Sequence, residues 1–269
     1  RCLSRGLGDV YKRQGMTPGS CPTNATEIHQ EGLRLPPMKL YNQGKPNKTL
    51  FTILEAASRT PEIVLADISA YVGACTVAEN RFLELVEEHG ASTLDRYLAE
   101  LLDYTERLAR AEITAMPDGK YYFEDKLDDD GVNLKNEVTI RLTITVDGDE
   151  LVYDFDGTDP QVASSMNNPL GSTRSAAVTA VRSMMGGDVP RNGGAWRPVT
   201  LNVPDGSLLN PQFPAPVASR GGTAQRLSDV LLGCQCQIRP ERMLACSSGV
   251  DTLLNIAGTD ANGDRSILT

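Results

Sequence analysis

The residues best suited to binding a ligand lie near the start of the chain, in the stretch 15–41, GMTPGSCPTNATEIHQEGLRLPPMKLY. It is rich in glycine, proline and small polar residues, where a core-forming segment would be rich in aliphatic ones. Pro18 fixes φ and Gly19 tolerates positive φ, so residues 17–20 predict a turn. The remainder fits neither a helical nor an alternating period. We therefore predict a long, ordered loop that lines a site.

A second candidate is the stretch 166–174, MNNPLGSTR, which places amides, hydroxyls and a guanidinium where a strand is expected to lead into a helix. Free N–H groups and the dipole at a helix N-terminus attract anions, so a phosphate, a carboxylate or a lactam can dock there. Alternatively Asn168 caps the helix, and one residue can do both. Residues 219–223, SRGGT, have the same layout but lack the lysine of a P-loop, which makes them poor evidence for nucleotide binding.

Two runs of carboxylates are candidates for a divalent cation, which prefers oxygen ligands. The first is DDDG at 128–131, preceded by Glu124 and Asp125, and the second is DFDGTDP at 154–160. The first lacks the spacing and the final glutamate of an EF-hand loop. Acidic turns at strand ends explain both runs, and this structural interpretation is favoured over a metal site.

Other residue types that carry catalysis are sparse. The chain has two histidines, His29 and His89, and no serine in a G-x-S-x-G elbow, which leaves little material for a triad or a zinc site. Cys234 and Cys236 are not spaced as a redox or zinc pair, so we expect them to pack in a helix. No complete catalytic set is present, and the catalytic residues stay unassigned.

Composition argues against several classes of function. The formal net charge is −9 with no basic cluster, so no nucleic-acid partner is expected. No apolar run approaches the roughly 20 residues that span a bilayer, so no membrane association is expected either. The six cysteines show no repeating spacing and no secretory signal precedes them, which indicates a reducing, cytoplasmic location.

Apolar periodicity predicts the elements that position the candidates. Three helices are expected, at 47–58, 61–89 and about 93–116. Asn47 is the predicted N-cap of the first, Gly90 ends the second, and Ser92 or Thr93 caps the third. Because the connection at Gly90 is short, the two long helices are expected to form an antiparallel hairpin.

Beyond residue 117 the period becomes alternating. Strands are predicted within KYYFEDKLDDDG, NEVTIRLTITV and DELVYDFDG, with a hairpin turn at Asp147-Gly148. Four further elements are expected: a helix after Asn168-Pro169, a β-rich stretch at 196–217, a helix at 224–237 and a strand at 243–248.

These elements define an α+β fold, in which a long helical hairpin is attached to a mixed, mainly antiparallel β-sheet core with further helices. The expected parts are a foreign segment at 1–14, a site-lining loop at 15–45, a helical hairpin at 46–116 and a sheet-containing α/β region at 117–269. Residues 1–14, RCLSRGLGDVYKRQ, lack an apolar period and resemble translated adapter sequence. Since the chain also stops within a strand-like run, we expect a fragment truncated at both ends.

Several blocks, in order along most of the chain, resemble the hydantoinase B/oxoprolinase family. They include EGLRLPP, LLDYTERLARAEITAMPDGKYYFEDKLDDDG, VYDFDGTDPQV, NNPLGSTRSA and RNGGAWRPVTLNVPDGSLLNPQFPAPVASRGGTAQR. The resemblance implies a subunit of an ATP-dependent hydrolase that opens a cyclic amide, hydantoin or 5-oxoproline, together with a hydantoinase A-type subunit that binds ATP as co-substrate. Two alternatives stay open: a subunit of an acetone-type ATP-dependent carboxylase acting on a ketone, and a non-catalytic scaffold for the ATP-binding subunit.

The resemblance also implies where a site would lie. In the carboxylase relatives, a histidine- and aspartate-containing motif just before the glycine corresponding to Gly15 holds a divalent metal, but here that place is taken by YKRQ. The metal is therefore expected in the complete protein and its ligands are not expected in this chain. What remains is the downstream wall of the site, whose substrate-binding candidates are Glu27, Glu31, Arg34, Asn167, Asn168 and Arg174.

Overall fold

The computed structural model describes residues 15–16, 22–242, 245, 249, 256–259 and 265–268. Its helices are α2 (Lys48–Ala57), α3 (Pro61–His89), α4 (Ala91–Thr114), α5 (Leu170–Met184) and α6 (Arg220–Gln235), with the 3-10 turns η1 (Ile28–Glu31), η2 (Gly193–Trp196) and η3 (Pro240–Arg242). Its strands are β1 (Tyr41–Asn42), β2 (Lys45–Pro46), β3 (Gly119–Leu127), β4 (Val138–Asp147), β5 (Glu150–Asp154), β6 (Val199–Asn202), β7 (Ile256–Thr259) and β8 (Arg265–Leu268).

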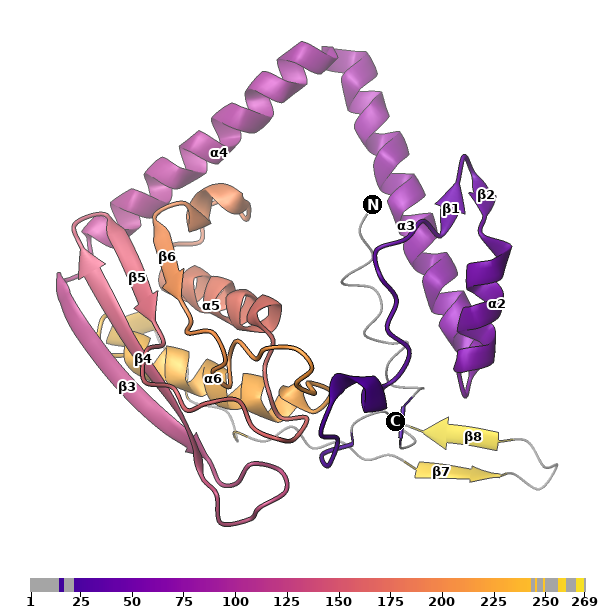
Figure 1. Ribbon diagram of the computed structural model, residues 1–269. Coiled ribbons are helices and arrows are strands. Elements are labelled where there is room, and N and C mark those ends of the chain that lie inside the picture. Colours follow the sequence, from indigo (N-terminus) through magenta and orange to yellow (C-terminus); the bar gives the residue numbers. More distant parts are fainter. Residues whose placement is uncertain are drawn as a thin grey trace.

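A four-stranded sheet forms the centre of one part of the molecule (Figure 1). Its strands lie in the order β3-β4-β5-β6, with β3, β4 and β5 antiparallel and β6 parallel to β5. Gly148, with a φ of 60°, lies in the tight turn that Asp147-Gly148 predicted between β4 and β5. The parallel pair needs a crossover connection, which contains α5. The α+β class and the mainly antiparallel sheet are therefore confirmed.

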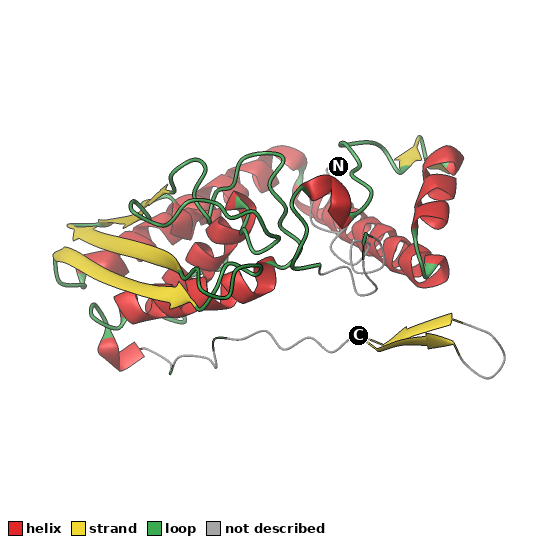
Figure 2. Cartoon of the chain, turned by 60° about the horizontal axis from the view of Figure 1, so that its bottom comes forward, coloured by secondary structure: helices red, strands yellow, loops and turns green. Residues whose placement is uncertain are grey.

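The main core lies between this sheet and the helices α5 and α6, which cover one of its faces (Figures 1 and 2). In β4, the side chains of Ile140, Leu142, Ile144 and Val146 point to this face and are at most 2 % exposed. Each contributes roughly 1.5–3 kcal/mol to folding by burial. The positions between them carry polar side chains, including Arg141, as the alternating period predicted.

A second, smaller core joins α2 to the first half of α3. Its buried side chains are Leu40, Leu50, Leu54, Val64 and Ile68. Asn47 caps α2 as predicted, since its Oδ1 accepts the N–H of Leu50 at 3.3 Å. α2 and the β1–β2 hairpin thus lie against one half of α3, well away from the sheet (Figure 1).

The two long helices meet at Gly90, as the sequence predicted, but Figure 1 shows them diverging from that point instead of running antiparallel side by side. The apolar side chains near the bend are exposed, Phe82 and Leu98 among them, so no contact holds the two helices together along their length there. Gly90, with a φ of 79°, is itself the N-cap residue of α4. Ser92 and Thr93 therefore lie inside the first turn, and the prediction that one of them caps the helix is wrong.

Less of the stretch 196–217 is strand than the sequence predicted. Within it only β6 forms, because the prolines that follow lack the N–H group that a ladder needs. Conversely, α6 begins at Arg220, before the predicted start at 224. The hydroxyl of Thr223 donates to the carbonyl of Met166, a tertiary contact in this first turn that local sequence does not reveal.

By length and composition alone, α3 is apolar enough to cross a membrane, and it is the one helix of the described residues that meets this test. The sequence showed no continuous apolar run of this length, because Asp67 and Glu79 interrupt the apolar residues of α3. Three other predictions fall outside the described residues: the foreign character of 1–14, the turn at 17–20 and the strand at 243–248.

Candidate functional site

The entry segment, which we define as residues 22–40, is loop except for the 3-10 turn η1, as the sequence predicted for this stretch. Gln30 stabilises the turn, because its side-chain oxygen accepts the N–H groups of Thr26 at 2.7 Å and of Glu27 at 3.4 Å. Glu27 therefore sits at the start of η1, with its side chain exposed.

Glu31 ties the entry segment to the loop 213–219, which precedes α6. Its Oε1 accepts the backbone N–H groups of Val217 and Ala218, both at 2.7 Å. The N–H of Ile28 adds a bond to the Pro214 carbonyl at 2.8 Å. The side chain of Glu31 is only 5 % exposed, and two partly buried N–H groups depend on this one carboxylate.

The surroundings of Glu31 set its charge state. Burial raises the pKa of its carboxyl, while the two N–H groups and the positive charge of Arg220 act in the opposite direction. Gly15 packs against the same residue: with its φ of +82°, a Cβ there would lie 2.7 Å from the carbonyl oxygen of Glu31. The positive φ and the close approach to Glu31 therefore both favour glycine at this position.

The residues between β5 and α5 form the third segment. Asn167 is fully buried, and its Nδ2 donates to the carbonyl of Pro216 at 3.0 Å. The hydroxyl of Ser165 contacts the Pro22 carbonyl and lies 2.8 Å from the hydroxyl of Ser219. We call the meeting of the entry segment, residues 162–168 and the loop 213–219 the seam. In Figure 1, η1 accordingly lies beside the N-terminal end of α6.

An exposed cluster borders the seam. The guanidinium carbon of Arg34 lies 4.8 Å from the centre of the Phe213 ring, and the ring of His29 meets the same phenyl edge-on at 5.5 Å. Phe213 is 64 % exposed, so a cation, an imidazole and an aromatic face are all presented to solvent. Such a set can bind an anionic or planar group.

Asn168 and Arg174 have different environments. The Nδ2 of Asn168 donates to the Thr173 hydroxyl at 2.9 Å, and its backbone N–H donates to the Leu208 carbonyl at 2.8 Å. The N-cap residue of α5 is Pro169, so the interpretation of Asn168 as the cap is wrong. The Oδ1 of Asn168 is buried without a hydrogen-bond partner, whereas the side chain of Arg174 is exposed. Of the six candidates, Glu31, Arg34 and Asn167 therefore meet at the loop 213–219.

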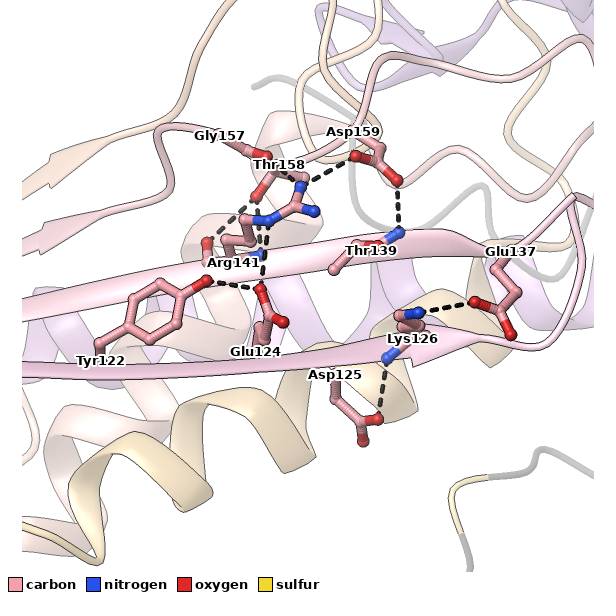
Figure 3. A network of polar contacts seen from close by, with 10 residues as sticks. All are labelled: Tyr122, Glu124, Asp125, Lys126, Glu137, Thr139, Arg141, Gly157, Thr158 and Asp159. Atoms are coloured by element: carbon pink, nitrogen blue, oxygen red, sulfur yellow. Dashed lines mark hydrogen bonds and ion pairs between the residues drawn. The ribbon is translucent and has the colours of Figure 1, made fainter.

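The carboxylates of 154–160 hold a turn against the open face of the sheet (Figure 3). Arg141 of β4 reaches the Gly157 carbonyl and pairs with Asp159 at 2.9 Å and with Glu124 at 3.2 Å. Asp159 also accepts the N–H of Thr139 at 2.7 Å. Burial alone would raise the pKa of Asp159, but the Thr139 N–H and the Arg141 guanidinium outweigh it and lower the pKa.

The run at 128–130 is also a turn. The Oδ1 of Asp130 accepts the N–H groups of Val132 and Asn133 at 2.9 and 2.7 Å, and Asp129 accepts that of Gly131 at 2.7 Å. The structural interpretation of both runs is therefore confirmed. Across the described part of the chain, no three His, Cys, Asp or Glu side chains come together as a metal site would require. The described residues therefore do not form a ligand set that fits the divalent metal that the resemblance implies.

Sequence reasoning did not connect the segments of the seam. Phe213 was not singled out because the stretch 196–217 was interpreted as β-rich, Ser219 was noted only as part of 219–223, and Ser165 was not noted. The signal that could have found them is the proline density at 211, 214 and 216, which argues for a shaped loop. The expectation that Cys234 and Cys236 both pack in a helix is half correct: Cys234 is buried in the last turn of α6, whereas Cys236 is its exposed C-cap residue.

The chain belongs to the family described as Hydantoinase B/oxoprolinase, which matches residues 10–268. A protein of Pseudomonas sp. (strain NS671), named as the putative B component of a D-/L-hydantoinase, is 34 % identical over 252 residues, which are 90 % of this chain and 42 % of that protein. The α+β architecture described above is thus that of a chain of the Hydantoinase B/oxoprolinase family.

Two solved structures have the same fold. The crystal structure of the ATP-dependent caprolactamase from Pseudomonas jessenii matches with a TM-score of 0.83 and 30 % identity, over 96 % of this chain and 44 % of that one. Nucleotide-free acetone carboxylase also gives a TM-score of 0.83, over 95 % of this chain and 36 % of that one, but at 16 % identity it shows the fold alone. The chain spans less than half the length of these relatives.

Proposed function

We propose that this chain is part of the B-type subunit of an ATP-dependent hydrolase that opens a cyclic amide, such as a hydantoin or 5-oxoproline, and that it acts with an A-type subunit that binds ATP. Membership of the hydantoinase B/oxoprolinase family and the 30 % identity to an enzyme named as an ATP-dependent caprolactamase support this proposal. The observation that carries it is the seam, where a buried Glu31 holds the entry segment on the loop 213–219.

In this proposal the residues of the seam have two kinds of role. Glu31 and Asn167 use their polar atoms on backbone groups, so they position the loop 213–219. Arg34 carries its guanidinium over Phe213 at the exposed border, where it can bind an anionic oxygen of the substrate. Glu27, Asn168 and Arg174 stay predictions as substrate contacts. Because the described residues do not fit a metal, no step is assigned to one.

The experiment uses the full-length B-type protein with its A-type subunit and ATP. Phosphate release is followed with 5-oxoproline, with a hydantoin, and with acetone plus bicarbonate. A cyclic amide is expected to drive release. Release with acetone and bicarbonate only would support the carboxylase alternative, and release with none of them would refute the proposal.

Arg34→Ala tests the substrate contact. Removing a charge-assisted hydrogen bond worth about 1.5–3 kcal/mol should raise KM roughly tenfold or more. Arg191→Ala is the matched control, because Arg191 is also exposed but belongs to the connection after α5. An unchanged KM in Arg34→Ala would show that this guanidinium does not touch the substrate.

A scaffold function is the second candidate, and the internal bonding of Glu31 and Asn167 favours it. Substituting Glu31 and Arg34 together distinguishes the scaffold function from a substrate-binding site. If turnover survives while assembly with the A-type subunit fails, the chain is a scaffold; if assembly survives while turnover fails, the site interpretation holds.

A further inference from the structure

The bend between α3 and α4 carries apolar side chains that the chain itself leaves in solvent. Six of them define what we call the tip surface, and each is between 43 and 57 % exposed: Phe82, Leu85, Tyr97, Leu98, Leu101 and Tyr104. Figure 1 shows this bend as the part of the molecule farthest from both cores. Side chains of this size, clustered and exposed, mark an interaction site.

The spacing shows that these residues form stripes. Tyr97, Leu101 and Tyr104 recur at the four- and three-residue intervals of one helix face. In the last part of α4 the buried positions are instead Ala109 and Ile113, which pack in the main core. The helix thus changes from a face that packs on its own domain to a face that packs on nothing in the described part of the chain.

The surface is also shaped. An open hollow of about 620 Å³ lies along α4, lined by Tyr97, Glu100, Leu101, Asp103, Tyr104 and Arg107. The guanidinium of Arg107 lies 5.9 Å from the Tyr104 ring and that of Arg96 lies 5.3 Å from the Tyr97 ring. Of the residues that line the hollow, tyrosine and arginine are the types enriched at the centres of interfaces.

The charges around the tip surface select its occupant. Residues 79–107 contain eight acidic and three basic side chains. Two of the acidic ones, Asp103 and Glu106, pair with Arg197, and Glu106 also pairs with Arg110, which leaves the surface acidic overall. A second copy docked through the same surface would bring acidic rims together, and an anionic lipid surface would repel them. The complementary occupant is a protein with an apolar patch and a basic rim. Since the 34 %-identical relative is named as one component of a hydantoinase that has several, a different subunit is the partner in question.

We propose that the tip surface of α3 and α4 is the docking site for the A-type subunit, through an apolar patch with a basic rim. This rests on the proposed function, because it takes its partner from there. In Figure 1 the bend at which α3 and α4 meet lies away from η1, the 3-10 turn of the seam.

The first experiment identifies which molecule binds to the tip surface. Leu98→Cys is introduced into the full-length B-type protein, a maleimide is added, and labelling is measured at that peptide by mass spectrometry. The cysteine is expected to react in the dilute, isolated protein and to be protected when the A-type subunit is added.

Every other occupant gives a distinct result, and each overturns the proposal. Protection in the dilute isolated protein means that the rest of its own chain covers the tip. Protection only at high concentration of the protein alone means a second copy. Protection only with vesicles of phosphatidylcholine and phosphatidylserine means a membrane, the alternative that the composition of α3 raises.

The second experiment measures affinity. Leu98→Arg combined with Leu101→Arg should weaken binding of the A-type subunit tenfold or more, and Glu100→Lys should weaken it several-fold at low salt and less at high salt. Leu134→Arg is the control, because Leu134 is 79 % exposed in the loop between β3 and β4. Equal affinity in the double variant and the control refutes the docking site. If the complex still forms and turns over, only this inference fails; if the wild-type proteins neither associate nor release phosphate, the proposed function fails as well.

Discussion

Replacing Glu31 by alanine should destabilise the protein by about 2–4 kcal/mol. The change removes the acceptor of two backbone N–H groups, those of Val217 and Ala218, which both bond to the same oxygen at 2.7 Å. A donor left without a partner costs about 1–3 kcal/mol when it is buried, and the cost here lies in the lower part of that range because both amides are only partly buried. Part of that cost is offset, because the variant no longer has to remove a carboxylate from water.

Glu31→Gln separates the hydrogen bonds from the charge. The amide keeps a carbonyl oxygen for both N–H groups, so the free energy of unfolding should stay within about 1 kcal/mol of the wild type. Burial raises the pKa of the Glu31 carboxyl above its usual 4.5. The folded state then holds this proton more tightly than the unfolded state. The stabilisation of the folded state by this proton is complete below pH 4.5 and is lost as the pH rises through the raised pKa. The stability of the glutamine variant relative to wild type should therefore increase over that interval.

Urea denaturation of the wild type, Glu31→Ala and Glu31→Gln between pH 4 and pH 8 measures the loss of the hydrogen bonds and the loss of the charge. Glu27→Gln is the control, since Glu27 is exposed and lies four residues before Glu31. The reasoning would be refuted by an alanine variant within about 0.5 kcal/mol of wild type. A glutamine variant as unstable as the alanine one would show that the charge, and not the pair of accepted bonds, holds the seam.

Two further predictions test packing and burial. Gly194→Ala should cost about 1–3 kcal/mol, because its Cβ would lie 2.1 Å from the Leu102 carbonyl oxygen, whereas Gly187→Ala meets nothing within 4 Å and should be nearly neutral; equal melting temperatures would contradict this. Burial raises the pKa of the Cys234 thiol to about 11, so iodoacetamide at pH 8 should modify the exposed Cys75 and spare Cys234 in the folded protein. Comparable rates of alkylation, measured by mass spectrometry, would show that Cys234 is not held inside α6.

The elements that local sequence determines were predicted well. The capping residue Asn47, the proline that starts α3 and the glycine that ends it gave the bounds of two helices. The Asp147-Gly148 turn and the alternating period gave the β4–β5 hairpin. These signals succeed because each acts within a few residues of the place that it marks.

What could not be predicted depends on contacts between distant segments. Nothing near Asn167 in the sequence reveals that its amide donates to the carbonyl of Pro216, which lies 49 residues further along the chain. In the same way, the short link at Gly90 is compatible with packed and with diverging helices, and only the exposure of the apolar side chains near the bend decides between them. Glu31 was named as a substrate-binding candidate from the family resemblance, and its bonds to the loop 213–219 came only from the structure.

The bonds of Glu31 also have a consequence for the order in which the chain folds. The acceptor and donor are separated by 186 residues, and the contact of Ser165 with Pro22 spans 143. At a translation rate of roughly 5–20 residues per second, the glutamate waits about 10–40 s on the ribosome before its partner amides are even synthesised. Long-range closures of this kind are entropically unfavourable until the elements between them are in place. The loop 213–219 should therefore acquire its final geometry last, after the sheet and the long helices have formed.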